Sequence, residues 1–290
     1  MDLRFNKMDN FAVMDISIQT VEASMFSKTF CSEHYHILLT ADSTCYQVDD
    51  VNYTSGSKSL IFLAPYQRFR IIDALDLHLM QLAFNGDYYC IELHKNEVSC
   101  NGLLFNSVYQ LPHVEVADDI YLELTSICGK MEKKIYQDTR FTNSIIKSYL
   151  QLLLSIASDE KQKFINHHFY FTQLRSEEGI IFQDLVEQFY KTEKSITFYA
   201  FRMHMSLPAF SRKIKRVLHK SPSKIIQERT ILEGKKLLHL TYKSVKEIAH
   251  ELCFEDQHYF SRYFKTHVGV SPTYYRQQVG ISAAANLSIE

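Results

Sequence analysis

A thirteen-residue pattern occurs twice in the last third of the chain, and it restricts the fold more than any other feature. The pattern Phe-Ser-Arg-x-x-Lys-x-x-x-x-x-Ser-Pro begins at Phe210 and again at Phe260, an offset of 50 residues. Each copy follows a short helical segment, a turn and a residue that can cap a helix, Ser206 or Asp256. This order predicts two helix-turn-helix units, with the repeated pattern on the second helix of each.

That second helix has an apolar face and a polar face in both copies. Its apolar positions are Phe210, Ile214, Val217 and Leu218 in the first copy and Phe260, Phe264 and Val268 in the second. Its polar positions include Arg212, Lys213, Lys215 and Arg216 in the first copy and Gln257, His258, Arg262 and Lys265 in the second. Arginine can form two hydrogen bonds to a guanine edge and glutamine two to an adenine edge, while lysine and arginine neutralise phosphates. We therefore expect segments 206–218 and 256–268 to read double-stranded DNA.

The segment between the two copies, 222–240, reads as one helix. Nineteen residues at about 1.5 Å each span roughly 28 Å, close to the roughly 34 Å of one DNA turn. Proline at 208, 222 and 272 falls where helices begin, and Ser244 with Glu247 forms a capping box that opens a helix through about Leu252. The alternative is a helical-repeat scaffold for protein binding. Such scaffolds usually stack three or more repeats, and only two copies are present.

Charge divides along the chain in a way that supports a polyanionic partner. Residues 1–190 hold 15 Lys+Arg and 25 Asp+Glu, a balance of -10, whereas residues 191–278 hold 17 and 7, a balance of +10. Charge alone leaves DNA, RNA and a membrane surface as candidates. No stretch approaches the roughly 18 apolar residues of a membrane helix, the N-terminus lacks a signal core, and none of the six cysteines forms a C-x-x-C pair. We expect a soluble, cytoplasmic protein that does not enter a membrane.

The N-terminal part reads mainly as β structure. Short apolar or alternating runs at 35–39, 59–63, 69–72, 77–84 and 102–105 are separated by turn-like segments at 52–57 and 85–87. Short strands at this spacing predict a small barrel or sandwich.

Residues 114–157 change to helical spacing. The apolar stripes are Val116, Ile120, Leu124 and Ile127, and then Ile145, Ile146, Tyr149, Leu152, Leu153 and Ile156. Stripes this wide must be buried, either on the barrel or on a second copy of the chain. The chain is thus divided into a sensor and dimerisation domain at 1–157, a linker at 158–179, a helical domain at 180–278 and a tail at 279–290.

Residues 180–277 resemble the AraC/XylS family of bacterial transcription regulators. The matching residues are Ile248, Ala249, Phe254, Tyr259 to Arg262, Phe264, Lys265, Gly269 to Pro272, Tyr275 and Arg276. The resemblance implies seven helices carrying two helix-turn-helix units. By position, it implies that the bases are faced by Pro208, Ser211, Arg212, Gln257, His258 and Arg262, together with Ser261. It places Lys215 and Lys265 near phosphates.

Three positions depart from the family pattern. Cys253 stands where the family usually has glycine, and it would be strained if its φ angle is positive. His219 stands where the second copy has Gly269, and Tyr199 stands where the second copy has the small Ala249. These departures predict that the first unit packs differently from the second.

The N-terminal part resembles the cupin-like sensor domain, with dimerisation helices, of many family members. The resemblance rests on the strand layout and on His34-Tyr35-His36, which puts two imidazoles on one face of a strand, as metal cupins do. The glutamate that should follow is absent, because Thr40, Ala41 and Asp42 stand there. We expect the histidines to line a barrel mouth and bind no metal. A cupin-type metal-binding enzyme fused to a helical domain is the alternative.

These observations predict an α+β chain that regulates transcription by binding two successive major-groove segments. We expect no catalytic site and no cofactor. The expected partners are double-stranded DNA and a second copy of the chain, and the further candidates are RNA polymerase and a small-molecule effector at the N-terminal domain.

Overall fold

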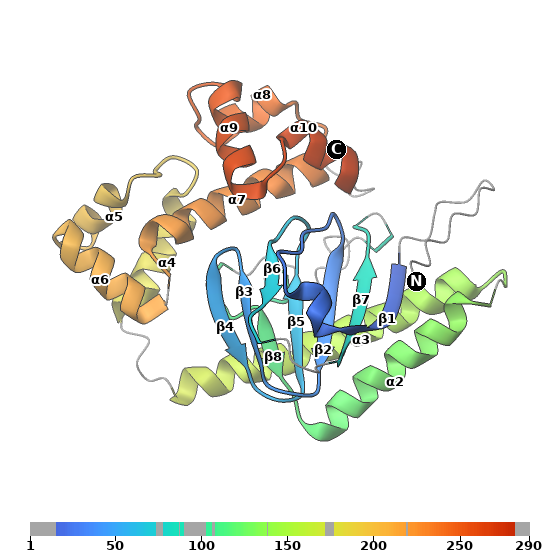
Figure 1. Cartoon of the computed structure of the whole chain (residues 1–290). Coiled ribbons are helices and arrows are strands. Elements are labelled where there is room, and N and C mark those ends of the chain that lie inside the picture. Colours follow the sequence, from blue (N-terminus) through green and yellow to red (C-terminus); the bar gives the residue numbers. More distant parts are fainter. Residues whose placement is uncertain are drawn as a thin grey trace.

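The computed structural model describes residues 16–73, 78–86, 88–89, 103–105, 108–137, 139–171, 177–218 and 220–281. An N-terminal domain of two sheets and two long helices is followed by a helical domain that lies beside one end of the sheets (Figure 1). The strands are β1 Ile16–Glu22, β2 Tyr35–Thr40, β3 Thr44–Val48, β4 Val51–Ser55, β5 Ser59–Leu63, β6 Phe69–Ile71, β7 His78–Phe84 and β8 His113–Glu115. A short 3-10 helix, η1 Ala23–Phe26, follows β1.

The strands form two antiparallel sheets that share one core. The five-stranded sheet has the order β1-β7-β2-β5-β8, and the three-stranded sheet has the order β4-β3-β6. Leu38 and Ile61 of the first sheet pack in one cluster with Tyr46 and Phe69 of the second. The two sheets therefore pack face to face, because alternate side chains of each strand point to the same side.

Two helices, α2 Asp118–Ile135 and α3 Thr142–Phe171, cover the outer face of the five-stranded sheet. Leu124 of α2 and Leu150 and Leu153 of α3 are fully buried in one cluster with Ile37 and Leu39 of β2. Of the two burial modes that the sequence left open for the helical stripes, packing on the sheet within one chain therefore occurs.

Two sequence-based assignments in this domain were wrong. The turn expected at 52–57 contains β4, an edge strand whose polar side chains face solvent while the intervening residues are partly buried. Residues 103–105 are not a strand; Leu104 and Phe105 bury their side chains against the five-stranded sheet and α2–α3. The strand that pairs with β5 is instead β8, which has only three residues.

The linker expected at 158–179 is also different, because α3 continues to Phe171. Lys161 is only 1% exposed, and its Nζ donates hydrogen bonds to the carbonyl oxygens of Leu111 (2.6 Å) and His113. Burial lowers the pKa of Lys161 to about 7. The polar composition at 158–163 therefore reflects a helix whose lysine is fixed to the segment around β8. Residues 172–176 lie outside the described part of the chain.

Seven helices follow from residue 177 onward. They are α4 Glu177–Phe189, α5 Ile196–Arg202, α6 Leu207–Leu218, α7 Pro222–Leu240, α8 Val245–Glu251, α9 Gln257–Val268 and α10 Pro272–Val279. The expected helix at 222–240 and the capping box of Ser244 with Glu247 are confirmed. None of the described helices has the length and apolar character needed to cross a membrane.

The helical domain has two cores joined by α7. Ile225 and Ile226 of α7 pack with α4, α5 and α6, whereas Leu237 and Leu238 pack with α8, α9 and α10. Each core thus holds one helix-turn-helix unit at one end of α7 (Figure 1).

Candidate nucleic-acid interface

The two reader helices, α6 and α9, are equivalent in length, in starting position and in the residues that they bury. Each has 12 residues, and each starts at the same position of the 50-residue repeat. Phe210 and Ile214 of α6 are fully buried, as are Phe260 and Phe264 of α9. The sequence-predicted apolar faces therefore turn inward in both units, which directs the polar faces outward.

The two helices begin differently. Asp256 caps α9, and its Oδ1 accepts hydrogen bonds from the backbone N–H groups of His258 (2.6 Å) and Tyr259 (2.7 Å). This cap satisfies N–H groups that the first helical turn leaves without a partner. In α6 the first two residues are Leu207 and Pro208, and proline is well suited to this turn because it has no N–H to satisfy.

The structure places the sequence-predicted site residues on the outer faces of α6 and α9. Exposed side chains are Pro208, Arg212 and Lys215 in the first unit and Gln257, His258, Arg262 and Lys265 in the second. Ser211 and Ser261 are half-buried one position before each arginine, and the Ser261 hydroxyl donates to the Gln257 carbonyl (2.7 Å).

Most cations on these two faces form no ion pair with a carboxylate of the described residues. Within the described residues, Arg212, Lys215, Arg262 and Lys265 form no ion pair. Lys213 instead pairs with Glu178 of α4 at 2.8 Å. Arg216 of α6 is also exposed and forms no ion pair among the described residues, so five reader cations are available to an external anion.

Other cations of the basic segment stabilise the domain itself. Arg229 bonds Glu187 of α4 (2.8 Å) and Glu233 one turn along α7 (3.1 Å). Lys220 pairs with Glu228 at 2.8 Å. The positive balance of residues 191–278 thus divides into structural ion pairs around α7 and free charges on the readers.

An exposed arginine near the start of a helix could instead pair with a neighbouring acid, but among the described residues Arg262 forms no ion pair with Glu255 or Asp256. Asp256 is instead occupied by the backbone of α9: the N–H of Tyr259, followed by that of His258, lowers the pKa of its carboxyl group. The charges of His258 and Arg262 act in the same direction. The Arg262 guanidinium is exposed and has no bonding partner among the described residues, so its donors are available to a ligand.

The turns of the two units differ by one residue, which corrects one sequence-based comparison. The backbone N–H of Met205 bonds the carbonyl of Ala200, and that of Phe254 bonds the carbonyl of Ala249, an offset of 49. Ala200, not Tyr199, is therefore the counterpart of Ala249, and both alanines are buried. The expectation that a bulky residue replaces the small one in the first unit was wrong, because Glu255 lengthens only the second turn.

The expected strain at Cys253 is confirmed, since its φ angle is +52°. The counterpart at offset 49, His204, has a φ angle of +53°, so both turns place a non-glycine residue in the left-handed region. Gly269, with a φ angle of +91°, ends α9. Its counterpart His219 lies outside the described residues.

The two histidines at the start of β2 do not form a metal-binding set. His34 precedes the strand, and its ring centroid is 6.4 Å from that of His36. His36 is buried, and its Nδ1 lies 3.0 Å from Nε2 of Gln81. In the part of the chain that the structure describes, no three His, Cys, Asp or Glu residues group closely enough to hold a metal ion.

The N-terminal domain packs against both units, which no pattern in the sequence predicted. Tyr66, only 8% exposed, joins the core of the second unit, and its ring centroid lies 5.3 Å from that of Tyr275. Val108 is buried in the core of the first unit, where the hydroxyl of Tyr109 donates to Glu187 (2.8 Å). These partners lie more than 70 residues apart in the chain, so no local pattern connects them.

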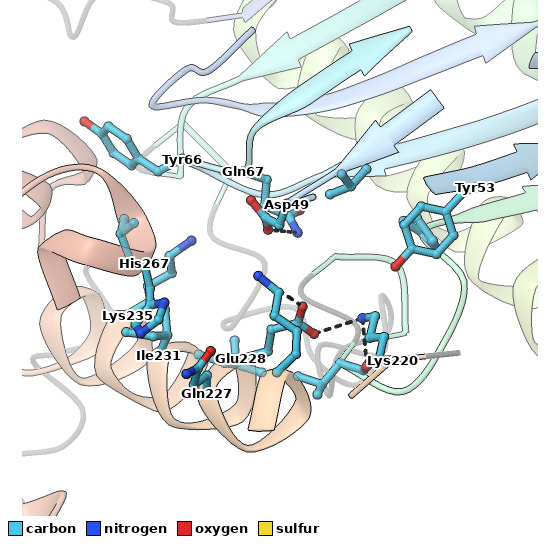
Figure 2. Close-up of a pocket in the computed structure, with 16 residues that line it drawn as sticks. Asp49, Tyr53, Tyr66, Gln67, Lys220, Gln227, Glu228, Ile231, Lys235 and His267 are labelled. Carbon is cyan, nitrogen blue, oxygen red and sulfur yellow. Dashed lines mark hydrogen bonds and ion pairs between the residues drawn. The ribbon is translucent and has the colours of Figure 1, made fainter. Parts of the chain in front are cut away.

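A cavity of about 70 Å³ lies between these two contacts. Figure 2 shows Asp49 and Gln67 of the N-terminal domain facing Glu228 and Lys220 of the helical domain. Nearby, Nζ of Lys235 donates to the carbonyl of Pro65 (2.8 Å), and burial lowers the pKa of Lys235. The contact between the domains, which we call the seam, is thus made by a half-buried lysine and an inserted tyrosine.

Comparison with known proteins agrees with this geometry. A family described as "Helix-turn-helix domain" matches residues 199–278. The uncharacterized HTH-type transcriptional regulator YfiF of Bacillus subtilis (strain 168) is 26% identical over 268 residues, which cover 84% of this chain and 80% of that protein. The raffinose operon transcriptional regulatory protein RafR of Pediococcus pentosaceus is 36% identical over 61 residues, 21% of this chain and 22% of that protein.

Among solved structures, fatty-acid-bound ToxT of Vibrio cholerae is 16% identical and aligns over 95% of this chain and 99% of its own, with a TM-score of 0.39. The family match and the two regulator relatives agree with the paired reader helices and their repeated motif. Together they show that the chain is a DNA-binding transcription regulator whose residues 199–278 match the helix-turn-helix domain family.

Proposed function

We propose that the chain reads one duplex DNA site through two successive major-groove segments, α6 in one and α9 in the next. The observation that carries this proposal is the pair of 12-residue readers, with equivalent residues exposed, at the two ends of α7. A 19-residue helix is about 28 Å long, which suits two grooves one DNA turn apart.

The exposed groups suggest two kinds of contact. Gln257, His258 and the two arginines can bond base edges, since they offer donors and acceptors at the exposed ends of their side chains. Lys215 and Lys265 lie one turn further along their helices and would hold phosphates as point charges. Sequence preference would then depend on the first group and salt dependence mainly on the second.

The test compares Gln257→Ala with Lys265→Ala in binding-site selection and in salt titrations. Gln257→Ala should cost about 1–3 kcal/mol at one base position and relax the preference there. Lys265→Ala should weaken all sequences about equally and lower the salt slope by about one. Lys133→Ala, at an exposed position of α2, is the matched control and should change neither.

If Gln257→Ala keeps every base preference of the wild type while Lys265→Ala alters one, this orientation of α9 is wrong. If the full chain shows no salt-sensitive binding to its promoter DNA, the two-groove proposal fails as a whole.

We also propose that the chain is a homodimer through α2 and α3. Leu122 of α2 and Leu152 of α3 remain exposed, whereas Leu153 belongs to the core of its own chain. Leu152→Glu should therefore convert a dimer to a monomer without unfolding the domain, because it places charge only in the interface. Sedimentation at micromolar concentration measures this. Met25→Glu, a charge at an exposed apolar position of η1, should leave the dimer intact.

We further propose that the N-terminal domain, a sensor of the cupin-like type, restrains the readers through the seam at Tyr66 and Lys235. A ligand or partner bound by that domain would act by loosening the seam. The acidic balance of residues 1–190 supports a restraining role, since it repels DNA while the domains are docked.

Tyr66→Ala should then raise DNA affinity about fivefold or more, the range of ordinary coupling between sites. Tyr136→Ala, an exposed tyrosine after α2, is the control and should not change it. Unchanged or weaker binding by a folded Tyr66→Ala variant would argue against restraint.

A further inference from the structure

The two readers carry the same side chains at three exposed or half-exposed positions and different ones in their first turn. At an offset of 50, Ser211, Arg212 and Lys215 repeat as Ser261, Arg262 and Lys265. Leu207 and Pro208 of α6 correspond to Gln257 and His258 of α9. Because both helices start at the same position of the repeat, the compared residues occupy equivalent positions on α6 and α9.

The shared positions should recognise the same chemistry in both grooves. Arg212 and Arg262 each follow a fully buried phenylalanine by two residues, and each is exposed and without an ion pair among the described residues. An arginine with a free guanidinium fork bonds O6 and N7 of guanine, the commonest specific contact in the major groove. The same fork in the same place favours the same base.

The first turns should recognise different chemistry. Leu207 is 38% exposed and Pro208 is exposed, and neither side chain can donate or accept a hydrogen bond. The only feature of a major-groove base edge that suits such side chains is the C5-methyl group of thymine. Gln257, by contrast, can bond N6 and N7 of adenine.

The end of the first helix of each unit shows the same contrast. Phe201, at the end of α5, is 77% exposed, and its counterpart at offset 49 is the exposed His250 of α8. The first unit thus exposes Phe201, Leu207 and Pro208, and the second exposes His250, Gln257 and His258 at the matching places.

We infer that the DNA site consists of two half-sites that share a guanine facing Arg212 and Arg262 and differ beside it: a thymine read through its methyl group under α6, and an adenine read through hydrogen bonds under α9. This inference rests on the proposed two-groove binding. It names the bases that the two readers distinguish.

The experiment begins with binding-site selection by the full-length protein. The guanine should recur at the same place in both half-sites of the selected DNA. Each thymine of the selected site is then replaced singly by deoxyuridine, which lacks only the methyl group. Replacement should weaken binding about fourfold at the position under Pro208, the value expected for one buried methyl group. Replacement in the half-site under α9 should have a smaller effect.

Exchange of the first turn tests the assignment to residues. Leu207→Gln combined with Pro208→His gives α6 the first turn of α9 and should change the first half-site from thymine to adenine while the guanine remains. Ile181→Gln, at an exposed apolar position of α4, is the matched control and should select the wild-type site. Circular dichroism confirms folding, and Arg212→Ala and Arg262→Ala should each lose the guanine in one half-site only.

The outcomes distinguish failure of the base assignment from failure of two-groove binding. A selected site without a shared guanine, or full tolerance of deoxyuridine in the half-site under α6, overturns the inference and leaves two-groove binding intact. If the wild-type protein selects no sequence, or one half-site only, the proposed function fails and the inference fails with it.

Discussion

The two helix-turn-helix units of this chain have equivalent reader helices, but different residues pack behind these helices. The core of the first unit is completed by Val108 of the N-terminal domain, and that of the second by Tyr66. The turn before the reader is one residue longer in the second unit, where Glu255 is added. Despite these differences, both readers run for 12 residues and bury an equivalent phenylalanine. Reader geometry is thus set by the short contact between helices within each unit, and the surroundings can vary.

The second reader also carries a histidine where the first carries an apolar residue. His267 stands on α9 where α6 has Val217 at the offset of 50. It lines the cavity between the domains, whereas the corresponding region of the first unit contacts α4 through Val217 and Gly179. The second unit should therefore respond more strongly to pH and to changes in the seam.

The largest expected effect tests whether the cores of the two units contribute equally to the stability of the chain. Phe210→Ala and Phe260→Ala each remove a fully buried ring and should lower the free energy of unfolding by about 3–5 kcal/mol. Chemical denaturation followed by circular dichroism measures both. Phe201→Ala, at an exposed position, is the control and should change stability little.

Equal losses of unfolding free energy would mean that the two phenylalanines stabilise their units equally. A loss below about 1 kcal/mol for one of them, smaller than cavity formation allows, would contradict the equivalence of the two phenylalanines.

The parts of the fold that could be predicted are those with local causes. The start of the helix at 222–240 was predicted because Pro222 suits the first turn of a helix, and the structure adds the Ser221 cap at the same place. The faces of the readers followed from helical spacing alone. The edge strand β4 was not predicted, because its polar residues resemble a turn when the pairing with β3 is unknown.

The rest of the site depends on contacts that sequence spacing does not encode. The one-residue shift between the turns was missed because the comparison was anchored on the readers, where the offset is 50, while the preceding helices are offset by 49. The insertion of Tyr66 beside Tyr275 and the bond from Lys235 to Pro65 join segments about 170 or more residues apart. Only the folded arrangement of the two domains brings them together.

A smaller effect should distinguish the units by pH. Burial lowers the pKa of His267 in the folded protein, and the charges of Lys224 and Arg68 add to this. Between the lowered pKa and the usual value of about 6.5, the unfolded chain binds more protons than the folded one, so stability falls as pH falls through this window. His267→Val, which copies the first unit, should reduce the loss of Tm between pH 7.5 and pH 5.5.

His78→Val, at an exposed position of β7, is the control and should leave the wild-type loss of Tm. The same loss in His267→Val as in the wild type would show that His267 does not cause the acid sensitivity.

The smallest expected effect concerns the feature that the two turns share. His204 and Cys253 have φ angles of +53° and +52°, a region that costs a residue with a Cβ atom roughly 1 kcal/mol. His204→Gly and Cys253→Gly should each raise the free energy of unfolding by about 0.5 kcal/mol, because glycine also gains freedom in the unfolded chain. His204→Ala and Cys253→Ala keep the Cβ atom and should give no such gain when measured by chemical denaturation. If alanine stabilises either turn as much as glycine does, the native side chain rather than the backbone is the source of strain there, and the two turns are less alike than their φ angles indicate.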